Sequence, residues 1–507
     1  MAGIGFSLKR LFGKKGLFNL CKAYGYAGIV TVGPMLLGVL LLAGMSLVAR
    51  MGNLPPKDSN LLNCMLTYGL LASLFVTTWF SMGVTRYVSD MLYEGGGAKV
   101  MPSFFGVTVI QLVVTAVVYG GFLAFSGVSL VRCILCLWFA MILTVVWTEM
   151  IYLTALRDFQ SIVLSFAICL MVGFVLALVM ILIGWVTVES LLLCMIVAYG
   201  LLAFRQLQLM LDYFPKSEGS KFSFLRWFSR YSNLVMAGGF LRIGLFSHLI
   251  IMYFGPLAQQ VEGLFYMAPE HDLPALIAFF SLLITTVSFV TSVEVNFYPK
   301  YSNYYGLFND RGAIKDIELA ESEMRSVLDR EMTYLGYKQV FTTLIAVVLV
   351  APLLRKLFPG FSSVSLSIFR FLCAGYGAYA LANSLMLICL YFEDYVGAVW
   401  GTGIFAVVST AATIWQINFG RPQFYGLGFF LGSILFFFFM LFRLGWYTKR
   451  LAYFLLANQN LVPSTEHGFF ADISNRLDWW QQQRREKKEK EMIEAAKRKM
   501  EEEGLRP

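Results

Sequence analysis

Charged residues are scarce in this sequence, and histidine is scarcer still. Charged side chains make up 14% of the 507 residues, and there are 3 histidines. A soluble globular domain carries about 25% charged residues, so this low content excludes an ordinary soluble protein. The 58% hydrophobic content and the 46 phenylalanines indicate a membrane protein instead. The net charge of +9 does not indicate a nucleic-acid partner, because the basic residues gather in a few loops and the C-terminal tail. Such segments suit an anionic lipid surface.

The motifs of common enzymes are also missing. No Ser/His/Asp arrangement, no glycine-rich phosphate loop after a strand and no His/Cys metal spacing is present. Cys133 and Cys136 form a close pair, but no second pair accompanies them, which favours helix packing over a redox or metal site. We therefore expect a protein that is not an enzyme and that holds no cofactor and no metal.

Long apolar runs dominate what is present. A bilayer crossing takes about 20 predominantly apolar residues, and twelve segments meet that criterion. They cover about residues 25–49, 60–83, 103–126, 131–154, 161–184, 188–211, 232–254, 273–296, 338–355, 368–391, 396–418 and 424–446. The pattern predicts an all-α polytopic membrane protein of twelve transmembrane helices. A basic stretch containing Pro215 separates the sixth segment from the seventh, which indicates two six-helix lobes, 24–211 and 232–447, joined by a linker at 212–231.

The Lys and Arg residues of the loops set the expected orientation. Most of them lie on one side if the N-terminus is inside, so both termini are predicted to be cytoplasmic. Residues 1–23 are predicted to form an interfacial amphipathic helix, and a basic leader that sets topology needs the same residues. Residues 311–337 are predicted to form an amphipathic inner-surface helix that supports a partner or shields the bundle. The tail, 448–507, is predicted to be charged and cytoplasmic, with a solvated helix favoured over a docking element.

We single out four of the ionisable residues in the apolar segments, because charge inside a membrane is costly and calls for a partner, a water-filled cavity or a function. Arg242 lies about 15 Å into the seventh segment and either contacts substrate or forms an internal ion pair with Glu149 or Glu294. Glu149 is predicted to line a cavity. His248 is either a proton-coupling site or a hydrogen-bonding residue between helices. We assign these four residues to a hypothetical substrate path.

Two further pairs suggest gating or hinge motion. Arg86 and Asp90 are spaced i,i+4 at the inner end of the second segment, where they form a local salt bridge or a gate. Pro34 follows Gly33 inside the first segment, and a proline there removes a backbone hydrogen bond. The pair acts either as a hinge or as a static bend.

Several short motifs resemble the Pel exopolysaccharide transporters (PelG). The opening MAGIGFSLKRLF, the following AYGYAG and the Gly33-Pro34 pair resemble the start of that family. Further motifs in the same order are Thr85–Asp90, Tyr266–Leu273, Glu294–Phe297 with Tyr301, Tyr304 and Tyr305, Tyr391–Tyr395 and Phe424–Phe430. The resemblance covers about residues 1–460. The sequence departs from the expected family pattern at Leu241-Arg242 and at His248-Leu249, so its central polar residues are rearranged.

The resemblance implies a member of the multidrug/oligosaccharidyl-lipid/polysaccharide flippase superfamily, with two helix bundles around a central cavity and alternating access. It further implies export of an N-acetylhexosamine-rich polysaccharide chain for a biofilm matrix, across the bacterial inner membrane. The implied partners are membrane lipid, a cytoplasmic glycosyltransferase and membrane scaffold subunits. Three rivals stay open: a lipid-linked oligosaccharide flippase or small-molecule exporter, a polytopic membrane enzyme, and a non-transporting scaffold.

Overall fold

The computed structural model describes residues 17–156, 159–309, 312–357, 361–457 and 468–502. The first half contains α2 (Leu17–Met51), α3 (Pro56–Tyr93), α4 (Val100–Ala124), α5 (Leu130–Leu156), α6 (Phe159–Ile183), α7 (Val188–Tyr213) and α8 (Leu225–Arg230). The second half contains α9 (Ser232–Met252), β1 (Gln259–Glu262), β2 (Phe265–Met267), α10 (Pro269–Phe279), α11 (Leu282–Thr291), α12 (Tyr298–Asn309) and α13 (Ile314–Ile345). It continues through α14 (Ala351–Leu357), α15 (Ser363–Tyr391), α16 (Tyr395–Phe419), α17 (Leu427–Thr448), α18 (Leu451–Ala457) and α19 (Phe469–Glu502).

The bundle is all-α apart from one two-stranded hairpin, and its membrane-crossing helices follow the apolar segments. Within the described residues, 11 helical stretches are long and apolar enough to cross a membrane. The first predicted segment lies in α2, whose described apolar part, Leu36–Met51, is shorter than the other stretches. Many outward-facing side chains are apolar, as in Val117 and Leu182, because lipid rather than water surrounds such a surface. The predicted polytopic all-α class is confirmed.

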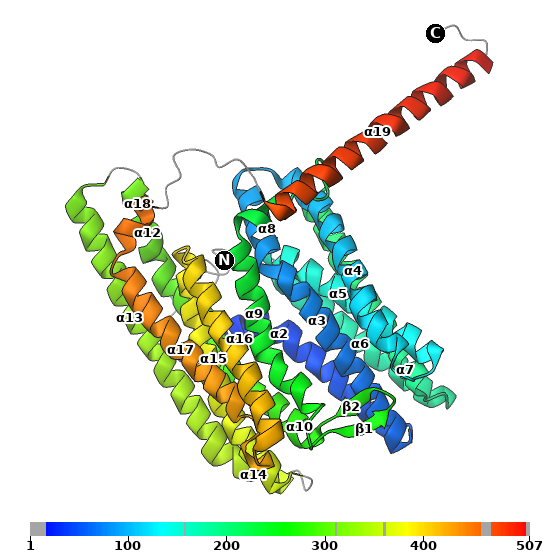
Figure 1. Ribbon diagram of the computed structural model, residues 1–507, viewed down its shortest axis with the longest axis vertical. Helices are drawn as coiled ribbons and strands as arrows, with labels where there is room; N and C mark the ends of the chain where they lie inside the picture. Colours follow the sequence, from blue (N-terminus) through cyan, green and yellow to red (C-terminus); the bar gives the residue numbers. More distant parts are fainter. Residues whose placement is uncertain (1–16, 157–158, 310–311, 358–360, 458–467, 503–507) are drawn as a thin grey trace.

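The buried apolar residues form two separate clusters, and these define two lobes. One cluster runs from Leu41 to Phe228 and also includes Phe265, and the other runs from Ala237 to Leu451. Figure 1 shows the two lobes side by side, with α3–α7 in one and α12–α18 in the other. The lobes contact each other mainly where α3 packs on α9 and where α2 packs on α11. Small residues permit the closer contact, since a Cβ atom on Gly239 would lie 2.3 Å from the Trp79 ring.

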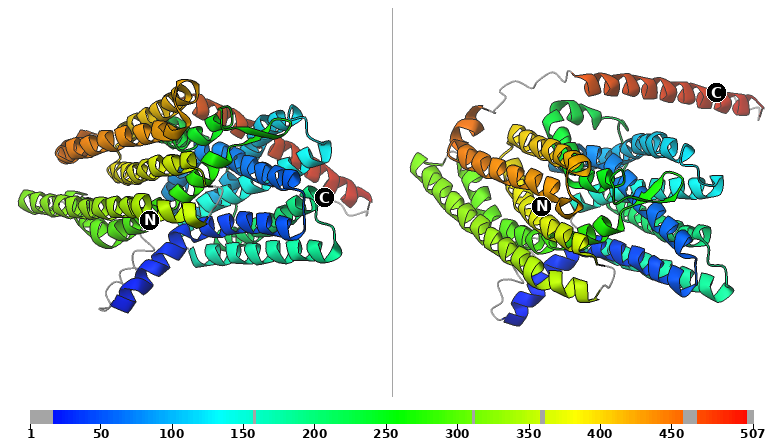
Figure 2. Two further views of the ribbon diagram at one scale, coloured as in Figure 1. Left: turned by 90° about the horizontal axis from the view of Figure 1, so that it is seen from below. Right: turned by 60° about the horizontal axis from the view of Figure 1, so that its bottom comes forward.

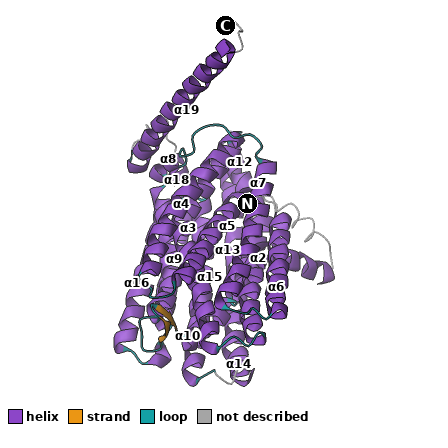
Figure 3. Cartoon of the chain, turned by 90° about the vertical axis from the view of Figure 1, so that its right-hand side faces the viewer, coloured by secondary structure: helices purple, strands orange, loops and turns teal. Residues whose placement is uncertain are grey.

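The two ends of the bundle differ, and we name them by their elements. The α8 end holds α8, α12 and α18, and the hairpin end holds β1, β2 and α10 (Figures 1 and 3). β1 and β2 pair antiparallel, with Gln259 opposite Met267. The pairing requires a tight reversal, which Gly263 makes at φ 56°.

The structure differs from the sequence prediction along the helix that follows α12. The predicted inner-surface helix and the predicted ninth crossing form one continuous stretch, Ile314–Lys356. Ala320, Met324 and Leu328 on its first part are buried, as the periodicity predicts. They pack within the C-terminal lobe, where α12 contacts α13. The helix continues through Gly336 without ending, and a π-helical turn at Ala346–Val350 connects α13 to α14.

The flanking segments are only partly described. Residues 1–16 of the predicted amphipathic helix, and the short connection at 157–158, lie outside the described residues. The α2 helix passes through Gly33 and Pro34 without ending, and it changes direction along its length (Figure 2). The first turns of α19 dock beside α8 through Asp478, which accepts a hydrogen bond from Arg226 at 3.2 Å. The remainder of α19 projects away from the bundle (Figure 1).

Candidate functional site: two contacts between the lobes

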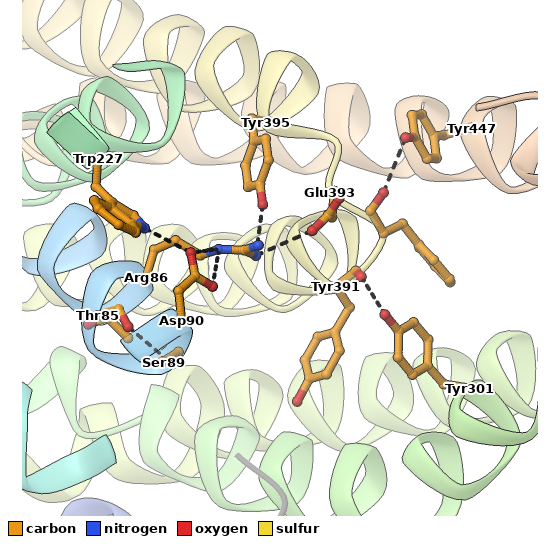
Figure 4. Close-up of polar contacts among 11 residues, drawn as sticks. Thr85, Arg86, Ser89, Asp90, Trp227, Tyr301, Tyr391, Glu393, Tyr395 and Tyr447 are labelled. Atoms are coloured by element: carbon orange, nitrogen blue, oxygen red, sulfur yellow. Dashed lines mark hydrogen bonds and ion pairs between the residues drawn. The ribbon is translucent and has the colours of Figure 1, made fainter. Parts of the chain in front are cut away.

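At the α8 end, Arg86 of α3 extends from the N-terminal lobe to the C-terminal lobe. Its Nε atom lies 3.1 Å from an Asp90 carboxylate oxygen, the local pair that the i,i+4 spacing predicts. Its Nη1 atom donates to Oε1 of Glu393 at 3.3 Å and to the hydroxyl of Tyr395 at 3.1 Å (Figure 4). Its guanidinium also lies over the Tyr231 ring, 5.0 Å from the centroid. Arg86 is therefore both a local salt-bridge partner and a link between lobes.

The surrounding groups hold this link in place without burying it. The indole N–H of Trp227 donates to Asp90 at 2.8 Å, which fixes the carboxylate that orients Arg86 (Figure 4). Glu393 adopts a φ of 62°, a conformation that is costly for a residue with a Cβ atom. The side chains of Arg86 and Glu393 are 32% and 53% exposed. An ion pair this exposed contributes about 0.2–1 kcal/mol, so the contact is specific in geometry but weak.

The tyrosine-rich segment after Glu294 meets the same loop. The Tyr301 hydroxyl donates to the backbone oxygen of Tyr391 at 3.0 Å, and that of Tyr447 donates to the backbone oxygen of Phe392 at 3.1 Å (Figure 4). Next in the chain, Asp394 accepts two hydrogen bonds from Arg443 at 2.6 and 2.7 Å. Three short motifs noted in the sequence, at 85–90, 294–305 and 391–395, thus converge at the α8 end.

At the hairpin end, the connection after α9 inserts into the N-terminal lobe. The Tyr68 hydroxyl of α3 donates to the backbone oxygen of Tyr266 at 3.1 Å and accepts from its backbone N–H at 3.2 Å. The Tyr68 ring stacks on Tyr253 with centroids 5.3 Å apart. Phe265 is fully buried and belongs to the apolar cluster of the opposite lobe. The apolar segments place this region between the seventh and eighth predicted crossings, and we predicted no strands there.

Backbone contacts fix the tip of the hairpin. The N–H of Leu264 donates to the backbone oxygen of Ser126 at 2.8 Å. Gly263 lies so close that a Cβ atom there would approach the Ser126 oxygen to 1.8 Å. Arg132 of α5 lies 3.4 Å from Glu262 and 2.6 Å from Glu189. We call the set Tyr68, Ser126, Arg132, Gly263 and Phe265 the hairpin clasp.

Arg242 lies half-buried in α9 within the C-terminal lobe. Among the described residues it forms no ion pair with Glu149, Glu294 or any other carboxylate. The described part of the chain therefore does not contain the internal ion pair that was the alternative prediction for Arg242. A guanidinium at this depth still requires water or a polar ligand.

Glu149 lies within the N-terminal lobe on α5, which packs on α3, α4 and α7. Its side chain is 1% exposed, and its Oε2 atom has no hydrogen-bond partner among the described residues. The adjacent Thr148 donates to Gln111 of α4. Glu294 lies on a wide π-helical turn, Ser292–Phe297, and is 5% exposed. Such turns are frequent at functional sites. Cavity lining by Glu149 and Glu294 stays a prediction.

His248 has a partner that the sequence analysis did not identify. Its Nδ1 atom lies 3.4 Å from Nε2 of His271, and its Nε2 atom lies 3.3 Å from the Tyr376 hydroxyl. Both histidines are 0% exposed. His248 therefore does bond between helices, and it shares that bond with a second titratable ring.

Solved structures share the fold of this chain. The Vibrio cholerae MATE transporter VcmN in the bent form has a TM-score of 0.57 at 11% identity, covering 85% of this chain and 99% of that one. The eukaryotic MATE transporter AtDTX14 has a TM-score of 0.53 at 12% identity, covering 85% of this chain and 98% of that one. At such identities the likeness shows the fold, a two-lobed flippase-like bundle. Among curated proteins, none matches this chain.

A family model covers most of the chain. The model for PelG, described as "Putative exopolysaccharide Exporter (EPS-E)", matches residues 1–455. Family and fold are those of a multi-pass membrane transporter rather than of an enzyme. This chain belongs to the PelG family of exopolysaccharide exporters.

Proposed function

We propose that this chain exports a Pel-type, N-acetylhexosamine-rich exopolysaccharide across the bacterial inner membrane, by alternating separation of its two lobes. The observation that carries the proposal is the pair of unlike contacts between the lobes, one at each end of the bundle. Arg86 bridges to Glu393 at the α8 end, and the hairpin clasp joins Tyr266 to Tyr68 at the other end. A two-lobed carrier needs a contact at each end that forms when that end is closed.

In this proposal the α8 end faces the cytoplasm, as the basic residues of the loops predict. A cytoplasmic glycosyltransferase supplies the growing chain there, and membrane scaffold subunits hold the two proteins together. The support is the family match together with the projecting, strongly charged α19. Sugar polymerisation belongs to that partner.

We further propose that Arg242 and Glu149 contact the polymer or the water that accompanies it. Both are ionisable, both lie within membrane-crossing stretches, and Arg242 lacks a carboxylate partner among the described residues. A guanidinium presents several donors in a fixed geometry, which suits sugar hydroxyls and amide carbonyls.

The test measures secreted polysaccharide in cells that carry Arg242→Ala or Glu149→Ala, with membrane levels of the protein confirmed. We expect both variants to reduce export by about tenfold or more, because each removes a functional intramembrane charge. Arg421→Ala is the matched control, since Arg421 is an exposed arginine in the connection between α16 and α17. Normal export from both variants contradicts the assignment of the path.

Deletion of the chain tests the transport role itself. We expect no polymer outside the cell and no lipid-linked oligosaccharide within the inner membrane. Accumulation of a lipid-linked oligosaccharide would instead identify a flippase of lipid-linked units. Continued secretion of polymer would contradict transport by this chain, and normal secretion with Arg242, Glu149 and Glu294 all replaced would identify a scaffold.

A further inference from the structure

A chain of four polar groups runs through the hairpin end of the C-terminal lobe. It joins Tyr376 of α15, His248 of α9, and His271 and Asp272 of α10. The ring atoms of the two histidines lie 3.4 Å apart, and Nδ1 of His271 lies 3.7 Å from Oδ1 of Asp272. At that separation the two atoms do not form a hydrogen bond, and neither of them has a hydrogen-bond partner among the described residues. Phe429 covers the His248 ring at a centroid distance of 4.5 Å, which excludes water from that side.

The hydrogen-bond rules of imidazole allow few proton arrangements in this chain. A neutral imidazole has one donor and one acceptor nitrogen, so one histidine donates to the other. The Asp272 carboxylate favours a proton on Nδ1 of His271. His271 then accepts from Nδ1 of His248, and His248 accepts from the Tyr376 hydroxyl. Three of the four ring nitrogens are used in this arrangement, and Nδ1 of His271 faces Asp272 at 3.7 Å without a hydrogen bond.

One added proton reverses the direction of the hydrogen bonds among these four groups. With both nitrogens protonated, the His271 imidazolium donates to Asp272 and to Nδ1 of His248. His248 then carries its single proton on Nε2 and donates it to the Tyr376 oxygen. The four groups together take up one proton and one positive charge, and no covalent bond between heavy atoms changes. The new charge faces the Asp272 carboxylate. A buried imidazolium needs such a facing anion.

Asp272, at one end of this row of polar groups, lies next to the hairpin clasp. Asp272 is 30% exposed, and its Oδ2 atom accepts the backbone N–H of Ala268 at 2.9 Å. Ala268 directly follows β2, so this bond holds the base of the hairpin. The hairpin residue Tyr266 contacts the other lobe through its backbone oxygen, which lies 3.8 Å from the Cys64 sulfur and 3.1 Å from the Tyr68 hydroxyl. Figure 3 shows the hairpin beside α10.

We propose that His248, His271 and Asp272 form a proton-binding site, with Tyr376 at its far end, and that proton binding there changes the hold of the hairpin on the N-terminal lobe. The carboxylate that faces the imidazolium through Oδ1 anchors Ala268 through Oδ2, so a closer approach of Oδ1 to the charged ring shifts the bond that holds the base of the hairpin. If the protein exports polymer as proposed above, the proton bound at this site is an ion that drives the export. The binding of the proton itself does not rest on that role.

Two carboxylates flank His271 in α10, Glu270 and Asp272, and among the described residues the one within 4 Å of its ring is Asp272. Arg242 lies on the same helix as His248, six residues before it. Tyr376 is the facing group on α15, and Phe429 of α17 is not ionisable. On α3 the ionisable groups beside the hairpin are Cys64 and Tyr68, which contact Tyr266, and Tyr253 stacks on Tyr68. Asp272 therefore supplies the negative charge of the site.

The first experiment observes the protons directly. The full chain in lipid nanodiscs is labelled with nitrogen-15 histidine, and imidazole signals are followed by NMR from mildly alkaline to mildly acid pH. The chain has 3 histidines, and His467→Gln removes the signal of the third. We expect the signals of His248 and His271 to change together in one titration. Asp272→Asn shifts that titration to lower pH, because the imidazolium loses its anion.

Two results overturn the proton site. The first result is that both histidines stay in one neutral tautomer over the whole pH range, and this measurement needs no variant. A titration that Asp272→Asn leaves unchanged is the second. Neither measurement uses polysaccharide, so failure here is distinct from failure of the proposed export.

The second experiment tests the link to the hairpin. Amide hydrogen exchange of residues 259–267 is compared between the native chain and His271→Gln at one mildly acid pH and one mildly alkaline pH. We expect acid to accelerate exchange in the native chain by about fivefold or more relative to the variant, the lower end of usual coupling between sites. Equal exchange in both proteins at both pH values overturns the coupling.

Discussion

The two contacts between the lobes consist of different kinds of interaction. At the α8 end, partly exposed charged groups meet: Arg86 from one lobe, Glu393 and Tyr395 from the other. At the hairpin end, the buried Phe265 and the backbone around Gly263 fit into the opposite lobe. Exposed ion pairs contribute little and exchange readily with water, whereas a buried ring and close backbone packing are lost only at a large cost. The difference indicates that the α8 end separates more easily than the hairpin end.

The largest expected effect comes from adding a methyl group at the tip of the hairpin. Gly263→Ala places Cβ against the Ser126 oxygen, so the hairpin must leave its site. Gly184→Ala is the matched control, because Gly184 has a φ of 75° but nothing within 4 Å. Both variants carry the strain of a positive φ, about 1–2 kcal/mol. We expect Gly263→Ala to be less stable than the control by about 1–3 kcal/mol in thermal unfolding. Equal stability would contradict the clasp.

A smaller effect is expected from removing one hydroxyl. Tyr68→Phe leaves the backbone N–H and oxygen of Tyr266 without this partner, which costs about 1–3 kcal/mol for buried groups. Tyr93→Phe removes a hydroxyl from a side chain that is 94% exposed, and we expect a change within about 0.5 kcal/mol. Hydrogen exchange of residues 259–267 checks that the loss is local. Faster exchange in Tyr93→Phe as well would show that the measurement does not report the clasp.

The smallest effect on stability is expected at the α8 end. Arg86→Gln removes the bonds to Glu393 and Tyr395, and we expect a loss of about 0.2–1 kcal/mol in thermal unfolding. Arg205→Gln, at an exposed arginine on α7, is the control. A loss as large as that of Gly263→Ala would show that the two ends hold the lobes equally, and it would remove the asymmetry.

The sequence predicts the helices well because lipid imposes a simple rule. Apolar length alone locates the crossings, and the i,i+4 spacing predicts the Arg86–Asp90 pair. The continuation of α13 into the bundle was missed, since an amphipathic run followed by an apolar run reads as two elements. Gly336 lies at the junction and suggests a break, but no proline accompanies it there, and the helix continues through the glycine.

Local sequence patterns could not predict the contacts between the lobes. Arg86 and Glu393 are 307 positions apart, and no periodicity connects them. The hairpin had a local signal that was passed over: two short strands separated by Gly263-Leu264, a two-residue turn that contains glycine. His271 was overlooked because it follows Pro269 and Glu270 in what reads as a loop. Only the fold brings it to His248.

The most direct measurement of the central claim exchanges the charges at the α8 end. Secreted polysaccharide is quantified in cells that carry Arg86→Glu, Glu393→Arg or both, with equal amounts of protein in the membrane. The account predicts that Arg86→Glu lowers export about tenfold or more, because like charges then meet between the lobes, and that the double variant recovers most of it. Normal export from Arg86→Glu, or a double variant no better than the single, would contradict a gate at this contact.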